Sequence, residues 1–117
     1  MRVESIIADL RVPDLEAARD FYAGYLGLSE ESLGLSWVTR HTDPRTGAGL
    51  QLLTRDATAP VPPVVSVKVD DVDEAYAEAR RRGYEIVHDL SQEAWGIRRF
   101  FVRAPDGNVL NIAQHSG

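Results

Sequence analysis

Asp9 is the side chain of this sequence best suited to polar chemistry, because it interrupts an apolar, β-prone stretch that predicts a strand over residues 5–12. A carboxylate within an apolar strand needs a partner or solvent. The interpretations that stay open are a structural ion pair with Arg11, Lys68 or Arg99, a contact for a cationic ligand, and a general base. No carboxylate occupies the matching place in the second half of the chain, so a paired acid–base mechanism has little support.

The tryptophans and histidines are the other candidates for a site. Trp95 lies in an irregular stretch just before a predicted strand, where it can be a packed loop anchor, a dimer contact or a ligand contact. Trp37 opens a strand, and this position favours core or interface packing over ligand contact. We expect His41, His88 and His115 at the surface, because none recurs in register in the two halves. Nothing in the sequence indicates a serine or cysteine nucleophile, a phosphate loop or a nucleotide fingerprint.

The elements that must position these residues form a unit that is written twice. The stretch LRVPDLEAA at residues 10–18 returns as VKVDDVDEA at residues 67–75. The end of each half repeats as well, since residues 43–52 match residues 104–112 with one extra residue in the first turn. Each position in one half therefore has a counterpart in the other, which can be compared with it.

The order predicted for each half is a strand, a helix and then further strands. Asp14 and Asp71 are placed to cap the helices, and Gly27 and Gly83 to end them. A proline-stiffened linker, residues 57–63, separates the halves. This is a βαβββ, linker, βαβββ plan of the α+β class. The strands bounded by these signals are expected at residues 5–12, 36–41, 49–54, 64–69, 97–103 and 108–114.

Length and composition define the class of protein. At 117 residues the chain is one domain in size, with one module at about residues 1–56 and a second at about 64–117. The absence of cysteine excludes disulfides and zinc–thiolate sites. The net charge of −5 disfavours nucleic acid, and the cluster Arg80–Arg82 is interpreted as a solvated helix end. Without a signal peptide or a bilayer-spanning apolar run, we expect a cytoplasmic protein with no membrane partner.

Three stretches carry a family resemblance: residues 11–22 with Leu26-Gly27, residues 69–73, and residues 95–108. They are similar to the vicinal oxygen chelate superfamily, also called the glyoxalase/bleomycin-resistance/dioxygenase fold, and nearest in pattern to its metal-free bleomycin-resistance-like members. The resemblance implies a homodimer and two tandem βαβββ modules whose curved mixed sheets surround a cavity. It does not fix an activity, because the superfamily includes isomerases, epimerases, dioxygenases, thiol transferases and non-catalytic drug binders.

The resemblance also places the four metal-ligand positions of the family's enzymes on Ile7, Gln51, Val64 and Asn111. Divalent cations need carboxylate or imidazole ligands, and two aliphatic residues with two neutral amides cannot form that shell. A one-residue slip in register brings no ligand to the two first-strand positions either. We therefore expect neither a metal nor another cofactor.

Strand alternation extends this mapping to the lining of the implied cavity. Phe101 and Arg99 are expected on the cavity side, whereas Phe100 and Val102 are expected beneath the helix. Trp95 is placed near the rim, where drug binders of the family stack aromatic side chains on planar ligands. The polar residues of the lining could equally satisfy one another. The expected ligand-binding residues are Ile7, Asp9, Trp37, Gln51, Val64, Ser66, Trp95, Arg99, Phe101 and Asn111.

Apolar walls with a few placed polar groups predict a small-molecule pocket. The leading hypothesis is a metal-free binding protein that sequesters an aromatic or cationic antibiotic or metabolite. The alternative is a metal-independent enzyme of the same fold, isomerase- or lyase-like, in which Asp9 or an arginine acts on a bound metabolite. A metal-dependent glyoxalase or dioxygenase is less favoured, because the ligands are missing.

Overall fold

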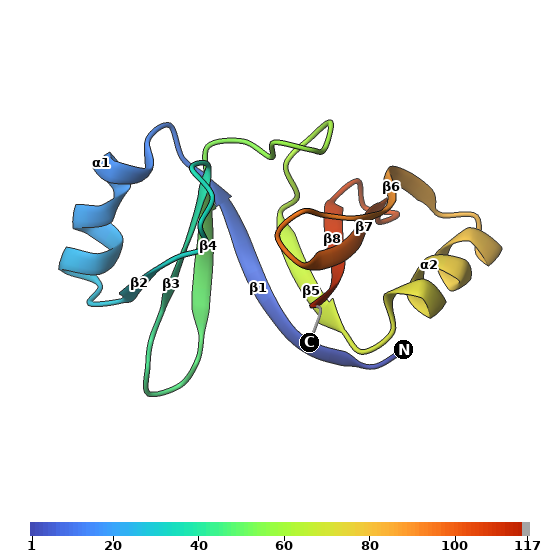
Figure 1. Ribbon diagram of the computed structural model, residues 1–117, viewed down its shortest axis with the longest axis horizontal. Helices are drawn as coiled ribbons and strands as arrows, with labels where there is room; N and C mark the ends of the chain where they lie inside the picture. Colours follow the sequence, from blue (N-terminus) through green and yellow to red (C-terminus); the bar gives the residue numbers. More distant parts are fainter. Residues whose placement is uncertain (116–117) are drawn as a thin grey trace. The chain divides into compact units, whose positions relative to one another are not determined.

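The computed structural model describes residues 1–115, and its elements follow the same order twice, as the sequence predicts (Figure 1). The chain divides into two compact units, Ile7–Pro62 (the N-terminal unit) and Met1–Ile6 together with Pro63–Gly117 (the C-terminal unit). The predicted linker at residues 57–63 has neither helix nor strand. Among the described residues, no helix combines the length and the apolar character that a membrane crossing requires.

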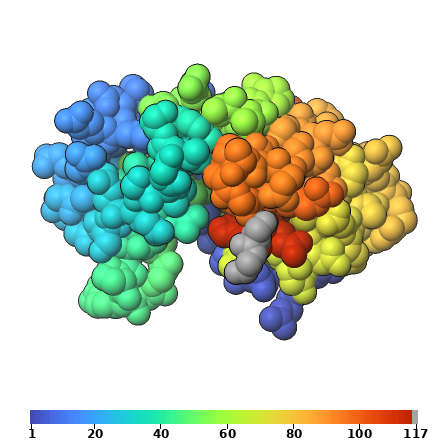
Figure 2. Space-filling model, in the orientation of Figure 1, coloured from blue at the N-terminus to red at the C-terminus, as the bar shows by residue number. Residues whose placement is uncertain are grey.

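The N-terminal unit is built on a mixed sheet with the strand order β2-β3-β4-β1. β1 (Val3–Arg11) runs parallel to β4 (Gly49–Leu53), and its residues from Ile7 onward belong to this unit. β3 (Val38–Thr42) lies antiparallel to β4 on one side and to β2 (Ser29–Ser32) on the other. The turn of the β3–β4 hairpin projects from the unit (Figures 1 and 2). Residues that lie opposite one another on these strands share a face of the sheet.

The helix of the N-terminal unit has two parts, an α-helix α1 (Leu15–Arg19) that continues as a π-helix η1 (Asp20–Tyr25). Asp14 caps it as predicted by accepting the backbone N–H of Glu16 at 2.9 Å. Gly27 follows with a φ of 72°, a conformation that glycine adopts without strain. The wider turns of η1 carry no signal in the apolar spacing, and no residue of either part is fully buried.

The C-terminal unit repeats the plan with the strand order β5-β8-β7-β6. β5 lies parallel to β8, and β7 is antiparallel to both β8 and β6. Two register shifts interrupt the pairing of β6 with β7. The elements of this unit are β5 (Val65–Val69), α2 (Val72–Arg81), β6 (Glu85–Gln92), β7 (Ile97–Arg103) and β8 (Val109–His115).

The core of the C-terminal unit lies between α2 and one face of its sheet. Val72, Ala75 and Ala79 are buried along one stripe of the helix. They belong to the same buried cluster as Phe100 of β7 and Ile112 of β8. The position of Phe100 confirms the predicted parity of β7, so the residues on either side of it face away from the helix.

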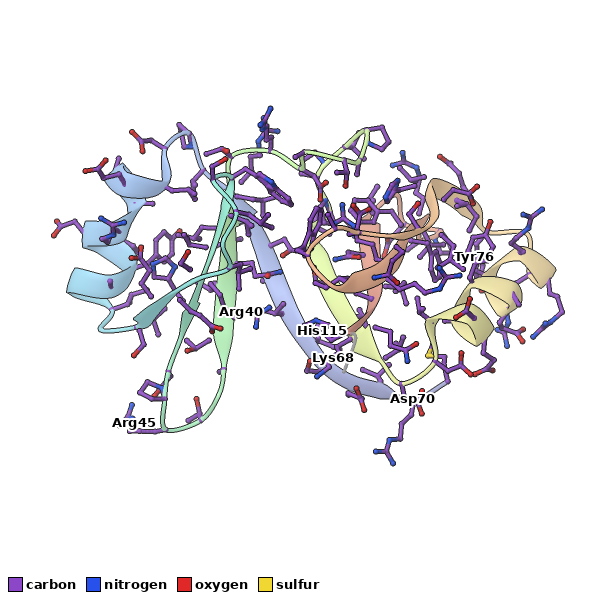
Figure 3. All side chains as sticks on the ribbon, viewed as in Figure 1. Arg40, Arg45, Lys68, Asp70, Tyr76 and His115 are labelled. Atoms are coloured by element: carbon purple, nitrogen blue, oxygen red, sulfur yellow. The ribbon has the colours of Figure 1, made fainter. Side chains whose placement is uncertain are left out.

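The outer surface of α2 carries ion pairs where the sequence predicted a solvated helix end. Glu78 accepts hydrogen bonds from Arg82 Nε at 2.8 Å and from Arg81 Nη2. The Arg82 and Arg81 guanidinium groups lower the pKa of Glu78 from its usual 4.5 to about 2. Arg80 instead donates to the hydroxyl of Tyr76, labelled in Figure 3, at 3.2 Å. These pairs join exposed side chains, as expected for a solvated helix end.

Candidate functional site

One face of the N-terminal sheet carries a row of polar side chains, Asp9, Gln51 and Arg40, opposite one another on β1, β4 and β3. Gln51 Nε2 donates to Asp9 Oδ1 at 2.8 Å, and Arg40 Nη2 (Arg40 is labelled in Figure 3) donates to Gln51 Oε1 at 3.3 Å. Asp9 is only 6% exposed, so the bond from Gln51 supplies part of the compensation that a buried carboxylate requires. The Gln51 amide is therefore engaged through both its oxygen and its nitrogen.

The opposite face of the same sheet holds a histidine that we expected at the surface. His41 is fully buried, with Nε2 3.6 Å from Glu30 Oε2 and its ring centre 6.2 Å from that of Tyr22 in η1. Glu30 Oε2 also accepts a hydrogen bond from Arg19 Nε at 2.9 Å. The surface prediction for His41 was wrong, because strand alternation turns it away from the face of its neighbour Arg40 and beneath the helix.

The equivalent face of the C-terminal sheet carries Ser66, Asn111, Phe101 and His88, opposite one another on β5, β8, β7 and β6. Asn111 Nδ2 donates to Ser66 Oγ at 3.0 Å. Asn111 Oδ1 is buried and has no hydrogen-bond partner among the residues that the structure describes. We call this face the polar face of the C-terminal unit. The face with Asp9, Gln51 and Arg40 is the polar face of the N-terminal unit.

Arg99 lies on the polar face of the C-terminal unit and is only 4% exposed. Its Nε donates to Glu93 Oε1 at 3.3 Å, and its guanidinium carbon lies 4.8 Å from the ring centre of Phe101 and 5.3 Å from that of Trp95. Glu93 Oε1 is also 3.1 Å from His88 Nε2. Two aromatic rings and a carboxylate therefore hold this buried cation, and both rings already contact a guanidinium group.

The other predicted site residues are Ile7, Trp37 and Val64. Ile7 is half-buried and has the strand parity of Asp9 on β1. Trp37 is buried directly before β3, and its carbonyl accepts the N–H of Thr54 at 3.0 Å. Val64 precedes β5 and is 44% exposed. The predicted residues that the structure brings together within a unit are Asp9 with Gln51, and Ser66, Trp95, Arg99 and Phe101 with Asn111.

Sequence reasoning missed Arg40 and Glu93, and it was wrong to expect His88 at the surface, because the His88 side chain is only 14% exposed and contacts Phe101. Arg40 could have been found from the β3–β4 hairpin, because the register of that hairpin puts it opposite Gln51. His88 was not recognisable from periodicity, since a register shift between Ile86 and His88 changes the alternation along β6. Glu93 follows the end of β6 in an irregular stretch, where no local pattern indicates its partner.

The donor atoms at the family's metal-ligand positions show whether these residues could bind a metal ion. Ile7 and Val64 have no donor atom in their side chains. Both groups of the Gln51 amide are hydrogen-bonded, and Asn111 offers a single neutral oxygen. Among the described residues, no three or more His, Cys, Asp or Glu side chains are grouped so that they could hold a metal ion. This donor set does not fit the carboxylate and imidazole shell of a divalent metal centre.

The chain matches the sequence profile of the Glyoxalase/Bleomycin resistance protein/Dioxygenase superfamily over residues 5–112. It therefore belongs to this superfamily, and its two βαβββ modules are those of the glyoxalase/bleomycin-resistance fold. No curated protein sequence gives a significant match to the chain.

Solved structures show the same fold at low sequence identity. A member of the superfamily from Vibrio splendidus 12B01 is 18% identical, with a TM-score of 0.70 over 97% of this chain and 99% of that one. A Legionella pneumophila protein described as an NAD-dependent benzaldehyde dehydrogenase is 20% identical, with a TM-score of 0.78 over 96% and 100%. Methylmalonyl-CoA epimerase from Mycobacterium tuberculosis is 18% identical, with a TM-score of 0.64 over 98% and 88%. At these identities the likeness shows the fold alone.

Proposed function

We propose that this protein is a metal-free small-molecule binding member of the superfamily. The observation that carries the proposal is the chemistry of the amides at two metal-ligand positions. Gln51 donates to Asp9 at 2.8 Å on β1. Asn111 donates to Ser66 at 3.0 Å on β5. Amides held in this way are neutral and directional, and Asn111 keeps a buried oxygen with no partner among the described residues, which suits an organic ligand better than a divalent cation.

The ligand that we propose is an aromatic or cationic compound, such as an antibiotic or a metabolite. Trp95 is partly exposed and contacts Arg99, and an indole ring at such a position is a candidate for stacking on a planar ligand. Stacking of this kind contributes about 0.5–1.5 kcal/mol beyond the burial of apolar area. In the N-terminal unit, taken by itself, the carboxylate of Asp9 is the charged acceptor that would suit a cationic group.

Tryptophan fluorescence tests the proposal, because each unit contains one tryptophan. In a Trp37→Phe background only Trp95 reports, and titration with planar antibiotics and metabolites should give saturable quenching or a shift of the emission maximum. The matched control is Trp95→Phe, in which the buried Trp37 should respond weakly or not at all. Silence of both variants across a chemically broad panel would contradict a small-molecule binding function.

Metal analysis tests the metal-free part separately. Protein purified without chelator should contain a divalent metal only well below one equivalent, measured by inductively coupled plasma mass spectrometry after dialysis. A stoichiometric metal that survives dialysis, and that Asn111→Leu and Gln51→Leu remove, would overturn this part of the proposal.

A metal-independent enzyme is the second candidate, and the burial of Asp9 is the observation that favours it. The Asp9 carboxylate is only 6% exposed and accepts a hydrogen bond from Gln51, so it is shielded from bulk water as the carboxylate of a general base often is. In that case Asp9→Asn should abolish turnover of a bound metabolite while its dissociation constant changes by less than about fivefold. Turnover at the wild-type rate in Asp9→Asn would remove Asp9 from any mechanism.

A homodimer and a cytoplasmic location stay predictions of this proposal. We infer the dimer from the family resemblance, and light scattering after size exclusion should then give twice the 13.0 kDa of the chain. A mass of 13.0 kDa at micromolar concentration would show a monomer.

A further inference from the structure

The two modules make the same hydrogen bond at the same place, and the comparison exposes one difference. In each module an amide on the last strand donates to the residue opposite it on the first strand. The pairs are Gln51 with Asp9 in the N-terminal unit and Asn111 with Ser66 in the C-terminal unit. The nitrogen of each amide is therefore satisfied within its own sheet.

The oxygens of the two amides differ in their surroundings. Gln51 Oε1 accepts a hydrogen bond from Arg40, the residue opposite it on β3. The residue opposite Asn111 on β7 is Phe101, whose ring has no donor. Asn111 Oδ1 consequently has no partner among the described residues, although Asn111 is only 9% exposed. A buried acceptor left in this state is unfavourable, and native proteins rarely retain one without a use.

Two neighbouring side chains, Phe101 and His88, are engaged in contacts of their own. The Phe101 ring is fully buried and lies 4.8 Å below the Arg99 guanidinium carbon. The His88 ring meets the Phe101 ring edge-on, with 5.2 Å between centres, and His88 Nε2 is directed to Glu93. Phe101 is thus held from two sides, and neither Phe101 nor His88 supplies a donor to Asn111 Oδ1.

We infer that Asn111 Oδ1 is the hydrogen-bond acceptor for the ligand, and that the ligand presents a neutral N–H or O–H donor on an aromatic or heteroaromatic ring. This inference rests on the proposed function and narrows its ligand class. An uncharged donor fits better than an ammonium group, because Arg99 already places a positive charge against Phe101, with Glu93 as its counter-ion. The aromatic part of the ligand suits a face that carries Phe101 and Trp95.

A pair of probes that differ only in this donor tests the inference. Indole has a ring N–H, and 1-methylindole has the same ring without it. We expect indole to shift the side-chain amide signal of Asn111 in a nitrogen-15 NMR titration and to bind about five- to a hundredfold more tightly than 1-methylindole. In Asn111→Leu the two probes should bind equally. Equal affinities in the wild type, a difference that persists in Asn111→Leu, or no binding of either probe would each overturn the inference.

Stability separates this role from a structural one. Leucine removes the unsatisfied oxygen but also the bond to Ser66, so the two effects oppose each other and Asn111→Leu should unfold in urea close to the wild-type midpoint. The matched variant is Gln51→Leu, which breaks bonds to Asp9 and Arg40 and should lower the midpoint. A lowered midpoint in Asn111→Leu would indicate a structural amide or an ordered water at this place. If the antibiotic panel binds while the indole pair shows no difference, the proposed function stands and this inference fails.

Discussion

The buried Arg99–Glu93 pair gives the sharpest test of how the C-terminal unit is held together. Glu93→Gln keeps the shape of the side chain and removes its charge, which leaves the Arg99 guanidinium buried with one counter-charge fewer. The two side chains are 5% and 7% exposed, and Nε and Oε1 are 3.3 Å apart. Removal of one partner from a buried pair typically costs about 3–5 kcal/mol. Because the glutamine can still accept a hydrogen bond and the rings of Trp95 and Phe101 remain, we expect a loss of about 2–3 kcal/mol.

A second ion pair between β6 and β7 offers a matched control at the surface. Arg103 Nε and Glu85 Oε2 are also 3.3 Å apart and bridge β7 to β6, but their side chains are 39% and 61% exposed. Water screens this pair, so Glu85→Gln should lower the free energy of unfolding by less than about 1 kcal/mol. The two variants thus share the distance and the substitution and differ in burial.

The assay is urea unfolding followed by Trp95 fluorescence, with every variant in the Trp37→Phe background so that the signal reports on the C-terminal unit. A double variant, Glu93→Gln with Arg99→Met, should lose less stability than the sum of the single variants, because it removes both members of the pair together. A loss in Glu93→Gln no larger than in Glu85→Gln, or additive losses in the double variant, would refute the argument that burial makes this pair strong.

Three further predictions follow from other parts of the structure. His41→Leu should keep or raise the melting temperature, because both ring nitrogens of His41 are buried without a hydrogen bond among the described residues, and a clear fall would contradict this. Phe100→Ala should lower the free energy of unfolding by about 3–5 kcal/mol in the same urea assay, since it opens a cavity under α2, and a loss below about 1 kcal/mol would exclude this packing. The stabilisation from Glu78 is fully present above its usual pKa of 4.5 and should disappear as the pH falls toward about 2, because Arg82 and Arg81 lower its folded-state pKa. Glu78→Gln should accordingly be less sensitive to acid over this range in thermal melts, and an unchanged pH profile would show that the pairs add nothing.

Much of the fold could be predicted because its signals are local. The caps at Asp14 and Asp71 and the proline-stiffened linker lie within a few residues of the elements that they bound. Strand alternation predicted correctly that Phe100 would lie beneath the helix. The π-helical continuation of α1 was not predictable, because its wider turns leave no mark on the apolar spacing.

The candidate site was only half predictable, because its contacts join strands that are distant in the sequence. The family resemblance, with which the internal repeat agrees, was enough to predict that Gln51 and Asn111 occupy positions where metal ligands would be expected. The sequence did not predict that Arg40 donates a hydrogen bond to Gln51. It also did not predict that Glu93, which lies in an irregular stretch, accepts a hydrogen bond from Arg99. Those partners depend on how the strands pair and where β6 shifts its register.

The sequence by itself determined the duplicated βαβββ plan, the parity of the strands and the lack of carboxylate or imidazole groups at the four metal positions. These properties are set by residue identity and by periods of a few residues. Only the tertiary structure decided which of the two amides keeps an open oxygen. Gln51 faces an arginine across its sheet and Asn111 faces a phenylalanine, and this difference exists only once the strands have aligned.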